Sequence, residues 1–467
     1  MSKDYQAIVI GAGPGGYPCA IRLAQLGVKT LVIEKEYWGG VCLNVGCIPS
    51  KALIGASNTY QKMLHASELG FDVTGEIKPN MTKLQEWKSS VVNKLTGGVK
   101  MLLKANGVEQ MMGTARLVAA DTVAVTTADG EKTITADAIV IATGSSPIEI
   151  PGFSFADDHI IDSTGALELA DIPKHLAVIG GGYIGLEMSG VFARLGSEVT
   201  VVEMQDQLLP GFDPDVVKVV ARRAKKDGVK AMLKTRALGW KKAKGGVALT
   251  VQDDKDQETV LKCDKVLVTV GRRPNSANLG LEDLGVEMDG PFIKVDKSLR
   301  TNVAGVYAIG DVAGQPMLAH KATHEGEVVA EIIAGKPVDL DFKAIPAVVF
   351  TEPEIAHVGL TEPEAKTAGH ELLVGKVPFA AIGKAIANNA TEGFVKVMVD
   401  KNTKRILGVT VVGHHASDII SEACLAIEMC AEAMDIGLTI HPHPTLGESI
   451  MEAAKAALGE AIHVVNR

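Results

Sequence analysis

The sequence predicts an α/β protein with two Rossmann-like dinucleotide-binding domains in one chain. Two observations carry this prediction. A strand, a glycine-rich loop, a helix and a second strand that ends in an acidic residue follow one another twice. The chain of 467 residues is also too long for a single hydrophobic core, so three or four domains are expected.

The first copy of the pattern opens with an apolar run, 7–10, that indicates a buried strand. A helical pattern then runs to Gly27, and a second strand is expected over 28–33. The glycines, in G-x-G-x-x-G spacing, and the acid that ends the second strand are Gly11, Gly13, Gly16 and Glu34. Such glycines make a tight turn, let the backbone approach a pyrophosphate and let helix and strand pack closely, while the acid binds ribose hydroxyls.

The second copy has strands at 176–179 and 198–202, and its glycines and acid are Gly180, Gly182, Gly185 and Glu203. The acid follows the first glycine at the same offset in both copies, which two unrelated loops rarely share. A carboxylate at this position accepts hydrogen bonds from a ribose 2′-hydroxyl and repels a 2′-phosphate. Glu203 therefore favours NAD over NADP.

Three further strand ends are marked by glycine. IVIATGSSP (139–147) and VLVTVGRRP (266–274) echo each other, each downstream of its own glycine loop. VYAIGDVAG (306–314) puts Asp311 at a strand end, where its carboxylate is expected to reach a ribityl or ribose hydroxyl. Helix capping is the alternative role for this aspartate.

Composition argues against several classes of function. Aromatic residues make up 4% of the chain and its net charge is −9, which disfavours nucleic-acid binding. The sequence shows no apolar run of membrane-span length, no room for a signal peptide and too few cysteines for a disulfide scaffold, so a cytoplasmic protein is expected. The Lys and Arg residues between 222 and 244 are interpreted as a solvated surface, with docking on an acidic partner as the alternative.

Cys42 and Cys47 lie close together in GGVCLNVGCIPSK (39–51). The other cysteines are scattered without a CxxC pair, so no metal site is expected. A purely structural disulfide across so short a loop would contribute only about 2 kcal/mol. A redox pair fits better. Pro49 suits the N1 position of a helix, so Cys47 would lie just before the helix, where the dipole and Lys51 favour a thiolate. Cys42 is expected further out, within reach of a substrate thiol.

These motifs resemble those of the FAD-dependent pyridine nucleotide–disulfide oxidoreductases over essentially the whole chain. The matching segments are GAGPGGY, GGVCLNVGCIPSK, DSTGALEL, GGGYIGLEM, TVGRRPN, AIGDVAGQPMLAHKATHEG, TEPEIAHVGLTE and HPHPTLGESI. Within the family, the resemblance is strongest to the members that oxidise dihydrolipoamide. It implies an FAD-binding domain (1–149), an NAD-binding domain (150–275), a central domain that completes the FAD site (276–346) and an α+β C-terminal dimerisation domain (347–467).

The resemblance also implies which residues hold the cofactors. FAD is expected on Gly11, Gly13, Pro14, Gly16, Glu34, Lys35, Gly40, Val41, Cys42, Lys51, Gly113, Thr143, Gly144, Ser145, Asp311, Met317, Leu318, Ala319 and His320. NAD is expected on Gly180, Gly182, Tyr183, Ile184, Gly185, Glu203, Ala237 and Gly271. Lys51 matches the family lysine beside the flavin N5, and Glu187 matches its ion-pair partner.

The family motif places the catalytic base at His443 and its carboxylate partner at Glu448, whereas His441 is interpreted as structural. A histidine that takes and returns a proton is helped by a carboxylate that orients its ring and stabilises the imidazolium. In the family this histidine reaches the disulfide of the other subunit, so a homodimer is implied. A cis peptide bond is expected between His443 and Pro444.

The implied reaction oxidises dihydrolipoamide on a lipoyl domain through a redox-active Cys42–Cys47 disulfide and FAD, and reduces NAD⁺. The implied partners are the acyltransferase core of a 2-oxo acid dehydrogenase complex, the H protein of the glycine cleavage system, or both. Another disulfide reductase of the family and a non-catalytic FAD-binding scaffold are the alternatives. Val41 and Gly447 depart from the family pattern, in which many members have Thr and a larger residue.

Overall fold

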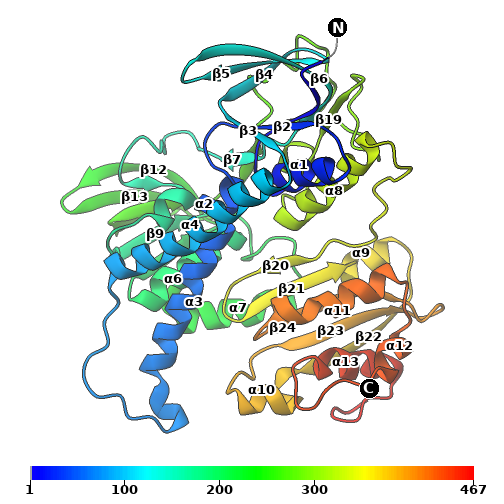
Figure 1. Ribbon diagram of the computed structural model, residues 1–467. Helices are drawn as coiled ribbons and strands as arrows, with labels where there is room; N and C mark the ends of the chain where they lie inside the picture. The colour runs from blue at the N-terminus through cyan, green and yellow to red at the C-terminus, as the bar shows by residue number, and fades with distance from the viewer. Residues whose placement is uncertain (1–2, 467) are drawn as a thin grey trace.

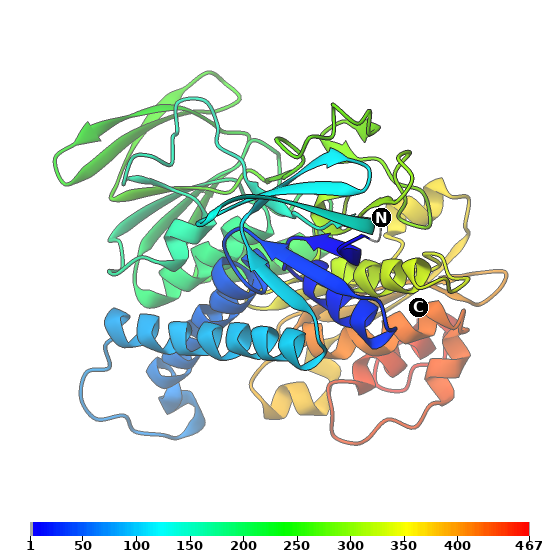
Figure 2. The same ribbon diagram turned by 45° about the horizontal axis from the view of Figure 1, so that its top comes forward.

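The computed structural model of the chain describes residues 3–466. Two sheet-containing units occupy the top and the left of Figure 1, and a third unit, which holds the C-terminal residues, lies at the lower right. The long helices α3 (Cys47–Leu64) and α4 (Met81–Ala105) run along the side of the second unit. The turned view in Figure 2 shows α4 lying across α3.

The first unit is built on a seven-stranded sheet. Its parallel part runs β3-β2-β1-β6, with β19 on the far side of β6, and its antiparallel part runs β6-β5-β4. Its strands are β1 (Tyr5–Ile10), β2 (Thr30–Glu34), β3 (Glu109–Met112), β4 (Thr114–Ala119), β5 (Thr122–Thr127), β6 (Gly130–Ile141) and β19 (Val306–Ala308). Its other helices are α1 (Gly16–Gln25), α2 (Gly40–Val45) and α8 (Ala319–Ile333). All five residues of β2 are buried, as expected for a parallel strand covered on both faces.

The second unit repeats this arrangement. Five parallel strands run β11-β10-β9-β15-β8, and a three-stranded antiparallel sheet, β12-β13-β14, corresponds to β4-β5-β6. The strands are β8 (Ile160–Ile161), β9 (His175–Ile179), β10 (Glu198–Val202), β11 (Val229–Met232), β12 (Arg236–Ala243), β13 (Gly246–Gln252), β14 (Glu258–Cys263) and β15 (Lys265–Val268). The helices are α5 (Ser163–Leu167), α6 (Tyr183–Leu195) and α7 (Pro214–Lys226). The predicted duplication therefore extends well beyond the glycine loops.

The two echoing segments form the paired connections between these units. β7 (Ser145–Pro147) is antiparallel to β16 (Arg272–Pro274), so the chain leaves the first unit and returns to it along one short ribbon. A further hairpin, β17 (Met288–Asp289) with β18 (Phe292–Ile293), precedes β19. The predicted domain boundaries stay predictions, because strands and core residues are shared across them.

The third unit has a five-stranded antiparallel sheet in the order β20-β21-β24-β23-β22. Its strands are β20 (Ala347–Val349), β21 (Glu354–Gly359), β22 (Leu372–Pro378), β23 (Phe394–Asp400) and β24 (Ile406–Gly413). Its helices are α9 (Glu362–Thr367), α10 (Gly383–Ala387), α11 (Ala416–Glu428), α12 (Ala433–Leu438) and α13 (Glu448–Leu458). This unit confirms the expected α+β class of the C-terminal region.

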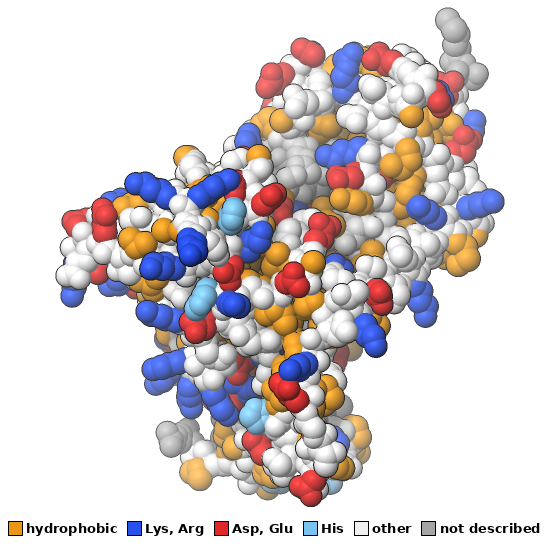
Figure 3. Space-filling view, turned by 90° about the vertical axis from the view of Figure 1, so that its left-hand side faces the viewer, with side chains coloured by type: hydrophobic (Ala, Val, Ile, Leu, Met, Phe, Trp, Pro, Cys, Tyr) orange, Lys and Arg blue, Asp and Glu red, His pale blue; other side chains and the backbone are white. Residues whose placement is uncertain are grey.

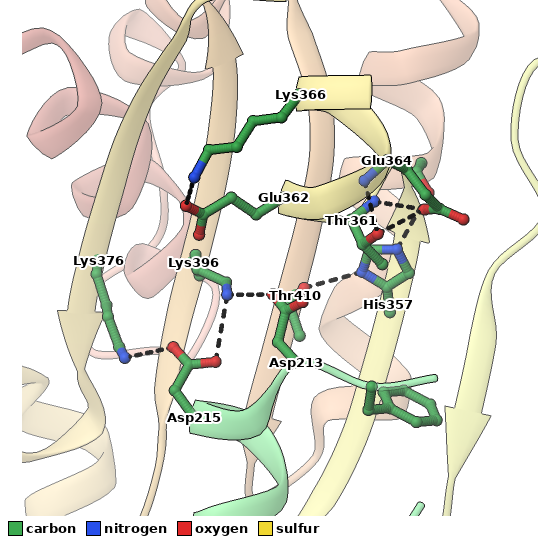
Figure 4. A network of polar contacts seen from close by, with 12 residues as sticks. Asp213, Asp215, His357, Thr361, Glu362, Glu364, Lys366, Lys376, Lys396 and Thr410 are labelled. Carbon is green, nitrogen blue, oxygen red and sulfur yellow. Dashed lines mark hydrogen bonds and ion pairs between the residues drawn. The ribbon is translucent and has the colours of Figure 1, made fainter. Parts of the chain in front are cut away.

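An ion-pair network around the buried Lys396 joins the second unit to the third (Figure 4). Lys396 on β23 is 3% exposed, and its ammonium group contacts the Asp213 carboxylate and, at 3.3 Å, the Asp215 carboxylate. Lys376, the cross-strand neighbour of Lys396 on β22, binds Asp215 at 2.7 Å. The two aspartates flank the first residue of α7, so two lysines of the third unit hold the N-terminus of a helix in the second.

Lys and Arg side chains gather on the side of the molecule that Figure 3 presents. Of the basic residues between 222 and 244, all except Arg223 are exposed. Arg223 is half-buried and paired with Asp227 at 2.8 Å and Glu392 at 3.2 Å. The exposure agrees with the interpretation of this segment as a solvated surface.

One helical stretch among the described residues, Gly40–Leu64, is long and apolar enough by length and composition to cross a membrane, with a mean hydropathy of 1.2. The sequence expectation concerned an uninterrupted apolar run, and polar residues such as Asn44, Ser50 and Lys51 interrupt this stretch. The stretch consists of α2 and α3, which meet at Gly46, and it carries both cysteines and the ion-paired Lys51. Its apolar residues Leu53 and Ile54 belong to a core cluster that also includes Leu186 of α6.

Candidate redox and dinucleotide sites

A cavity of about 470 Å³ opens between the first two units and runs along the glycine loop of the first. Its lining runs from Ile10, at the end of β1, to Ala322 on α8, and it brings together residues that lie far apart in the sequence. The predicted site residues on its wall are Gly11, Gly13, Pro14, Glu34, Lys35, Gly40, Val41, Cys42, Cys47, Lys51, Gly113, Thr143, Gly144, Ser145, Tyr183, Ile184, Glu187, Asp311, Met317 and Ala319.

The glycine loops have the geometry of phosphate cradles. A Cβ atom on Gly16 would lie 1.9 Å from the Gly11 carbonyl oxygen, and one on Gly185 would lie 2.1 Å from that of Gly180, so the third glycine of each loop is required by packing. A Cβ atom on Gly182 would meet nothing within 4 Å, and one on Gly13 only the Gly40 Cα at 3.8 Å. The second glycine of each loop thus leaves room for a group outside the protein chain, which fits a pyrophosphate.

The carboxylates of Glu34 and Glu203 are bound in the same way. Glu34 Oε2 accepts a hydrogen bond from the backbone nitrogen of Ala12 at 2.7 Å, and Glu203 Oε2 accepts one from that of Gly181 at 2.6 Å. In each case the other oxygen accepts from backbone nitrogens just downstream, including Gln205 in the second copy. Since a carboxylate accepts about four hydrogen bonds, both retain capacity for a ribose hydroxyl.

Asp311 is held by a chain of polar contacts at the cavity wall. The Ser145 hydroxyl donates to Asp311 Oδ2 at 2.5 Å. The same hydroxyl oxygen, Ser145 Oγ, accepts a hydrogen bond from Arg272 Nε at 2.8 Å. Arg272 also donates to the Ser145 carbonyl at 2.6 Å. The sequence prediction missed Arg272, although it lies in the matched TVGRRPN segment, because only Gly271 was assigned there.

Cys42 and Cys47 lie at the cavity wall on two successive helices: Cys42 is within α2, and Cys47 is the first residue of α3. A hydrogen bond from the Cys42 thiol, opposed by burial and assisted by Lys51, lowers the pKa of Cys47 to about 7. The same hydrogen bond and burial raise the pKa of Cys42. Cys47 is thus the thiol of the pair that ionises first in the reduced form, as predicted.

Two local expectations about this segment are wrong. The helix begins at Cys47 and not after it, because Gly46, with φ −140° and ψ −111°, reverses the chain and lets its carbonyl accept the first helical hydrogen bond, from Ser50. Pro49 is therefore the third residue of the helix. The expectation that Cys42 is the more exposed residue of the pair is also wrong, because Cys47 is exposed and Cys42 is half-buried. Both residues line the cavity, and the attack of a substrate thiol on Cys42 stays a prediction.

Lys51 and Glu187 form the predicted ion pair. Lys51 Nζ lies 2.8 Å from Glu187 Oε2, and the Glu187 side chain is 5% exposed. Lys51 is one helical turn after Cys47 on α3, while Glu187 comes from α6 of the second unit. The pair places a positive charge beside the cysteines and ties the two units together at the cavity.

His443, the predicted catalytic base, contacts its predicted carboxylate partner Glu448, and the two lie away from the cavity. His443 Nδ1 lies 2.9 Å from Glu448 Oε1, and the backbone nitrogen of Thr445 donates to Glu448 Oε2 at 2.8 Å. Burial would raise the pKa of Glu448, but the Thr445 amide and His443 outweigh it and lower the pKa. The His443–Pro444 bond is cis, as expected.

His443 is open to the outside, whereas His441 is not. The His443 side chain is 76% exposed, and among the described residues none beyond Ala322 lines the cavity. One chain therefore does not bring this base to its own cysteines. The His441 side chain is 6% exposed and binds Glu422 at 2.8 Å, in agreement with a structural role.

The remaining predicted residues lie outside the cavity wall. His320 is exposed and its ring contacts the Pro346 carbonyl at 2.7 Å, while Ala237 packs in the core cluster that includes Val202, the residue before Glu203. The others are Gly16, Leu318, Gly180, Gly182, Gly185, Glu203 and Gly271. Tyr183 and Ile184, which were expected to bind NAD, do line the cavity, so the start of α6 adjoins both this cavity and the second glycine loop.

Two family models match the chain. The pyridine nucleotide-disulphide oxidoreductase model matches residues 5–326, and the dimerisation-domain model of the same family matches residues 345–454. A dihydrolipoyl dehydrogenase of Bacillus subtilis is 50% identical over 465 residues, and one of Geobacillus stearothermophilus is 49% identical; each alignment covers 99% of this chain and 98% of the relative. One of Thermus scotoductus is 49% identical over the full length of both chains.

Solved structures share the fold. The crystal structure of LpdA from Mycobacterium tuberculosis has a TM-score of 0.90 and 28% identity, covering 96% of this chain and 99% of its own. The HOCl-induced flavoprotein disulfide reductase RclA from Escherichia coli, as a Cu(II) complex, has a TM-score of 0.87 and 28% identity, covering 97% and 99%.

Proposed function

The chain belongs to the pyridine nucleotide-disulphide oxidoreductase family, and from this premise we propose that it works as a dihydrolipoyl dehydrogenase, oxidising dihydrolipoamide to lipoamide and reducing NAD⁺. One observation carries the proposal at the level of the site. A cysteine pair in which the pKa of one thiol is lowered lies beside the Lys51–Glu187 ion pair, at a cavity that the first glycine loop and the start of α6 both line.

FAD and NAD are the cofactors of this enzyme. The first glycine loop, Glu34 and Asp311 would hold FAD in the cavity, and the second loop with Glu203 would hold NAD⁺. When bound, FAD would supply the two-electron chemistry that links the reduced cysteine pair to NAD⁺. The free acceptor capacity of Glu203 suits a 2′-hydroxyl, so NAD⁺ is preferred to NADP⁺.

The side chains carry out the thiol–disulfide exchange. His443 takes a proton from one thiol of dihydrolipoamide, and the resulting thiolate attacks the Cys42 sulfur of the Cys42–Cys47 disulfide. The bond between the two cysteines breaks and Cys47 leaves as a thiolate beside Lys51. The second substrate thiol then attacks the substrate sulfur of the mixed disulfide, closes the lipoyl ring and releases Cys42. Cys42 takes the proton that His443 holds, and the proton of the second thiol passes to His443, which is left protonated.

The proposal includes a homodimer in which each cavity receives its base from the other subunit. The match to a dimerisation domain and the separation of His443 from the cavity within one chain support it. The physiological electron donor is a lipoyl domain of a 2-oxo acid dehydrogenase complex, whose acyltransferase core is the partner, or the glycine cleavage H protein. The cytoplasm is the expected location.

The deciding experiment compares substrates on the purified enzyme. We expect turnover with free dihydrolipoamide and NAD⁺, and little with NADP⁺ or with oxidised glutathione and a reduced nicotinamide. Anaerobic titration with dihydrolipoamide should reduce the flavin promptly. A yellow protein that dihydrolipoamide leaves oxidised would favour a scaffold, and preferred use of glutathione would favour another reductase of the family.

Mixed dimers test the shared site. Cys42→Ser and His443→Gln subunits are each inactive, but a heterodimer of the two holds one complete site. Random reassortment of an equal mixture should therefore restore about a quarter of the wild-type activity, because half of the dimers are mixed and each has one working site of two. No recovery after reassortment, verified by mass spectrometry of the intact dimers, would contradict a site shared between subunits.

A further inference from the structure

The chain segment that follows β20 reaches the ion pair beside the cysteines. Lys51 Nζ lies 4.3 Å from the centre of the Phe350 ring, over its face. The backbone nitrogen of Phe350 donates a hydrogen bond of 2.9 Å to Glu187 Oε1, the oxygen that Lys51 does not bind. Lysine, glutamate and phenylalanine thus form a closed triangle in which each residue contacts the other two.

Phe350 itself is held on both sides. Its ring packs against the core cluster that contains Leu53 of α3 and Leu186 of α6, and Val349 before it is 3% exposed. Two residues further on, Glu352 Oε2 accepts a hydrogen bond of 3.2 Å from the side-chain amide of Asn58, also on α3. The segment therefore has little freedom to move away from the helix that carries Cys47 and Lys51.

We propose that Phe350 is a positioning residue for Lys51: its ring face and its backbone amide fix the lysine–glutamate pair at the cysteines, so that the dimerisation domain helps to set the electrostatics of the redox site in its own chain. The inference rests on the proposed function and adds to it a residue outside the cavity wall. A cation over an aromatic face is attracted by the ring quadrupole, and the attraction grows when both are shielded from water.

The consequence for the sulfur follows from the charges around it. The groups that face Cys47 are Cys42 on α2, Lys51 on its own helix, and Tyr183 and Glu187 on α6. In the proposed dimer, the base of the second subunit joins them. Without the ring, the Lys51 ammonium gains access to rotamers that point to solvent, since its side chain is already 31% exposed. The thiolate of Cys47 then loses part of its counter-charge.

The test measures the charge-transfer absorbance of the two-electron-reduced holoenzyme as a function of pH. We expect the midpoint of this absorbance, near 7 in the wild type, to rise by about 0.5 pH unit or more in Phe350→Leu. Phe350→Met, with a similar volume and no ring, should show the same rise and serves if the leucine variant does not fold. Phe350→Tyr keeps the ring face and should titrate like the wild type.

Phe342→Leu is the matched control. It also removes an aromatic ring from this part of the chain, but the Phe342 ring contacts His324 and not Lys51. Reduction with dithiothreitol keeps the measurement independent of the proposed substrate, so a wild-type enzyme inert to dihydrolipoamide would overturn the function and leave this test standing. An unchanged midpoint in both ring-free variants would overturn the positioning role. So would an equal rise in Phe350→Tyr or in Phe342→Leu.

Discussion

Replacing Glu448 by Gln removes the negative charge beside the base while keeping a side chain of the same size. The two charges are 2.9 Å apart when the imidazolium forms, and Coulomb's law gives them about 1.4 kcal/mol even in the dielectric of water. This energy corresponds to a factor of about ten in rate. Glu448 is only 18% exposed, so the effective dielectric is lower than that of water. We therefore expect a loss of about 10- to 100-fold.

The assay is anaerobic stopped-flow reduction of the flavin by dihydrolipoamide between pH 6 and 9. Reduction of the flavin by NADH does not use His443 and should proceed at the wild-type rate. Glu422→Gln is the matched control. Glu422 binds His441 at 2.8 Å, and His441 lies in the same segment as His443, but neither residue has a proposed part in the reaction. If dihydrolipoamide reduced the flavin equally fast in Glu448→Gln and the wild type at every pH, the assignment of His443 as base and Glu448 as its partner would be refuted.

Three further predictions follow from the geometry. Because the pKa of Cys47 is lowered to about 7, its thiolate persists above that pH and is lost below it, so iodoacetamide should alkylate Cys47 in the reduced enzyme progressively more slowly from pH 8 to pH 6, as followed by mass spectrometry. Gly182→Ala should raise the KM for NAD⁺ in a folded protein, whereas Gly185→Ala should fail to fold, as circular dichroism would reveal. Lys396→Met leaves the Asp213 carboxylate, which is 11% exposed, without its cation, whereas Asp215 keeps Lys376, so the change should lower the free energy of unfolding by about 3 kcal/mol in urea titrations at fixed protein concentration. Lys376→Met, whose side chain is 43% exposed, should lower it by less than about 1 kcal/mol.

Local pattern was enough to predict the parts of the site that lie on single elements. The glycine loops, Glu34 and Glu203 follow from strand–loop–helix spacing, and the structure gives both carboxylates the same hydrogen bonds. The Cys42–Cys47 pair was predicted from its spacing in one short segment. The Lys51–Glu187 pair joins α3 to α6, and it was predicted only because the family resemblance implies it; it is present at 2.8 Å. For the residues that lie on one element, the residue type and its position in the strand–loop–helix pattern were enough to predict its contacts.

Contacts between elements could not be predicted in the same way. Arg272 supports Asp311 only because β16 pairs with β7, and this pairing joins residues more than 120 positions apart. Phe350 contacts Glu187 across 163 positions, and Lys396 contacts Asp213 across 183. No periodicity within a segment encodes such pairings, because they depend on how the three units dock. The start of α3 was missed for a local reason, the reversed backbone of Gly46.

The balance of contacts at Cys47 explains why distant residues matter to this site. The hydrogen bond from Cys42 and the charge of Lys51 lower the pKa of Cys47, while burial and Glu187 raise it, and the result lies at about 7. At neutral pH such a thiol is about half ionised, and a rise of half a unit leaves only about a quarter of it as thiolate. The same rise from a pKa of about 5 would leave the thiolate almost complete. A sulfur balanced near neutrality therefore responds to small movements of Lys51, and a contact such as the ring of Phe350 acts where the ionised fraction is most sensitive.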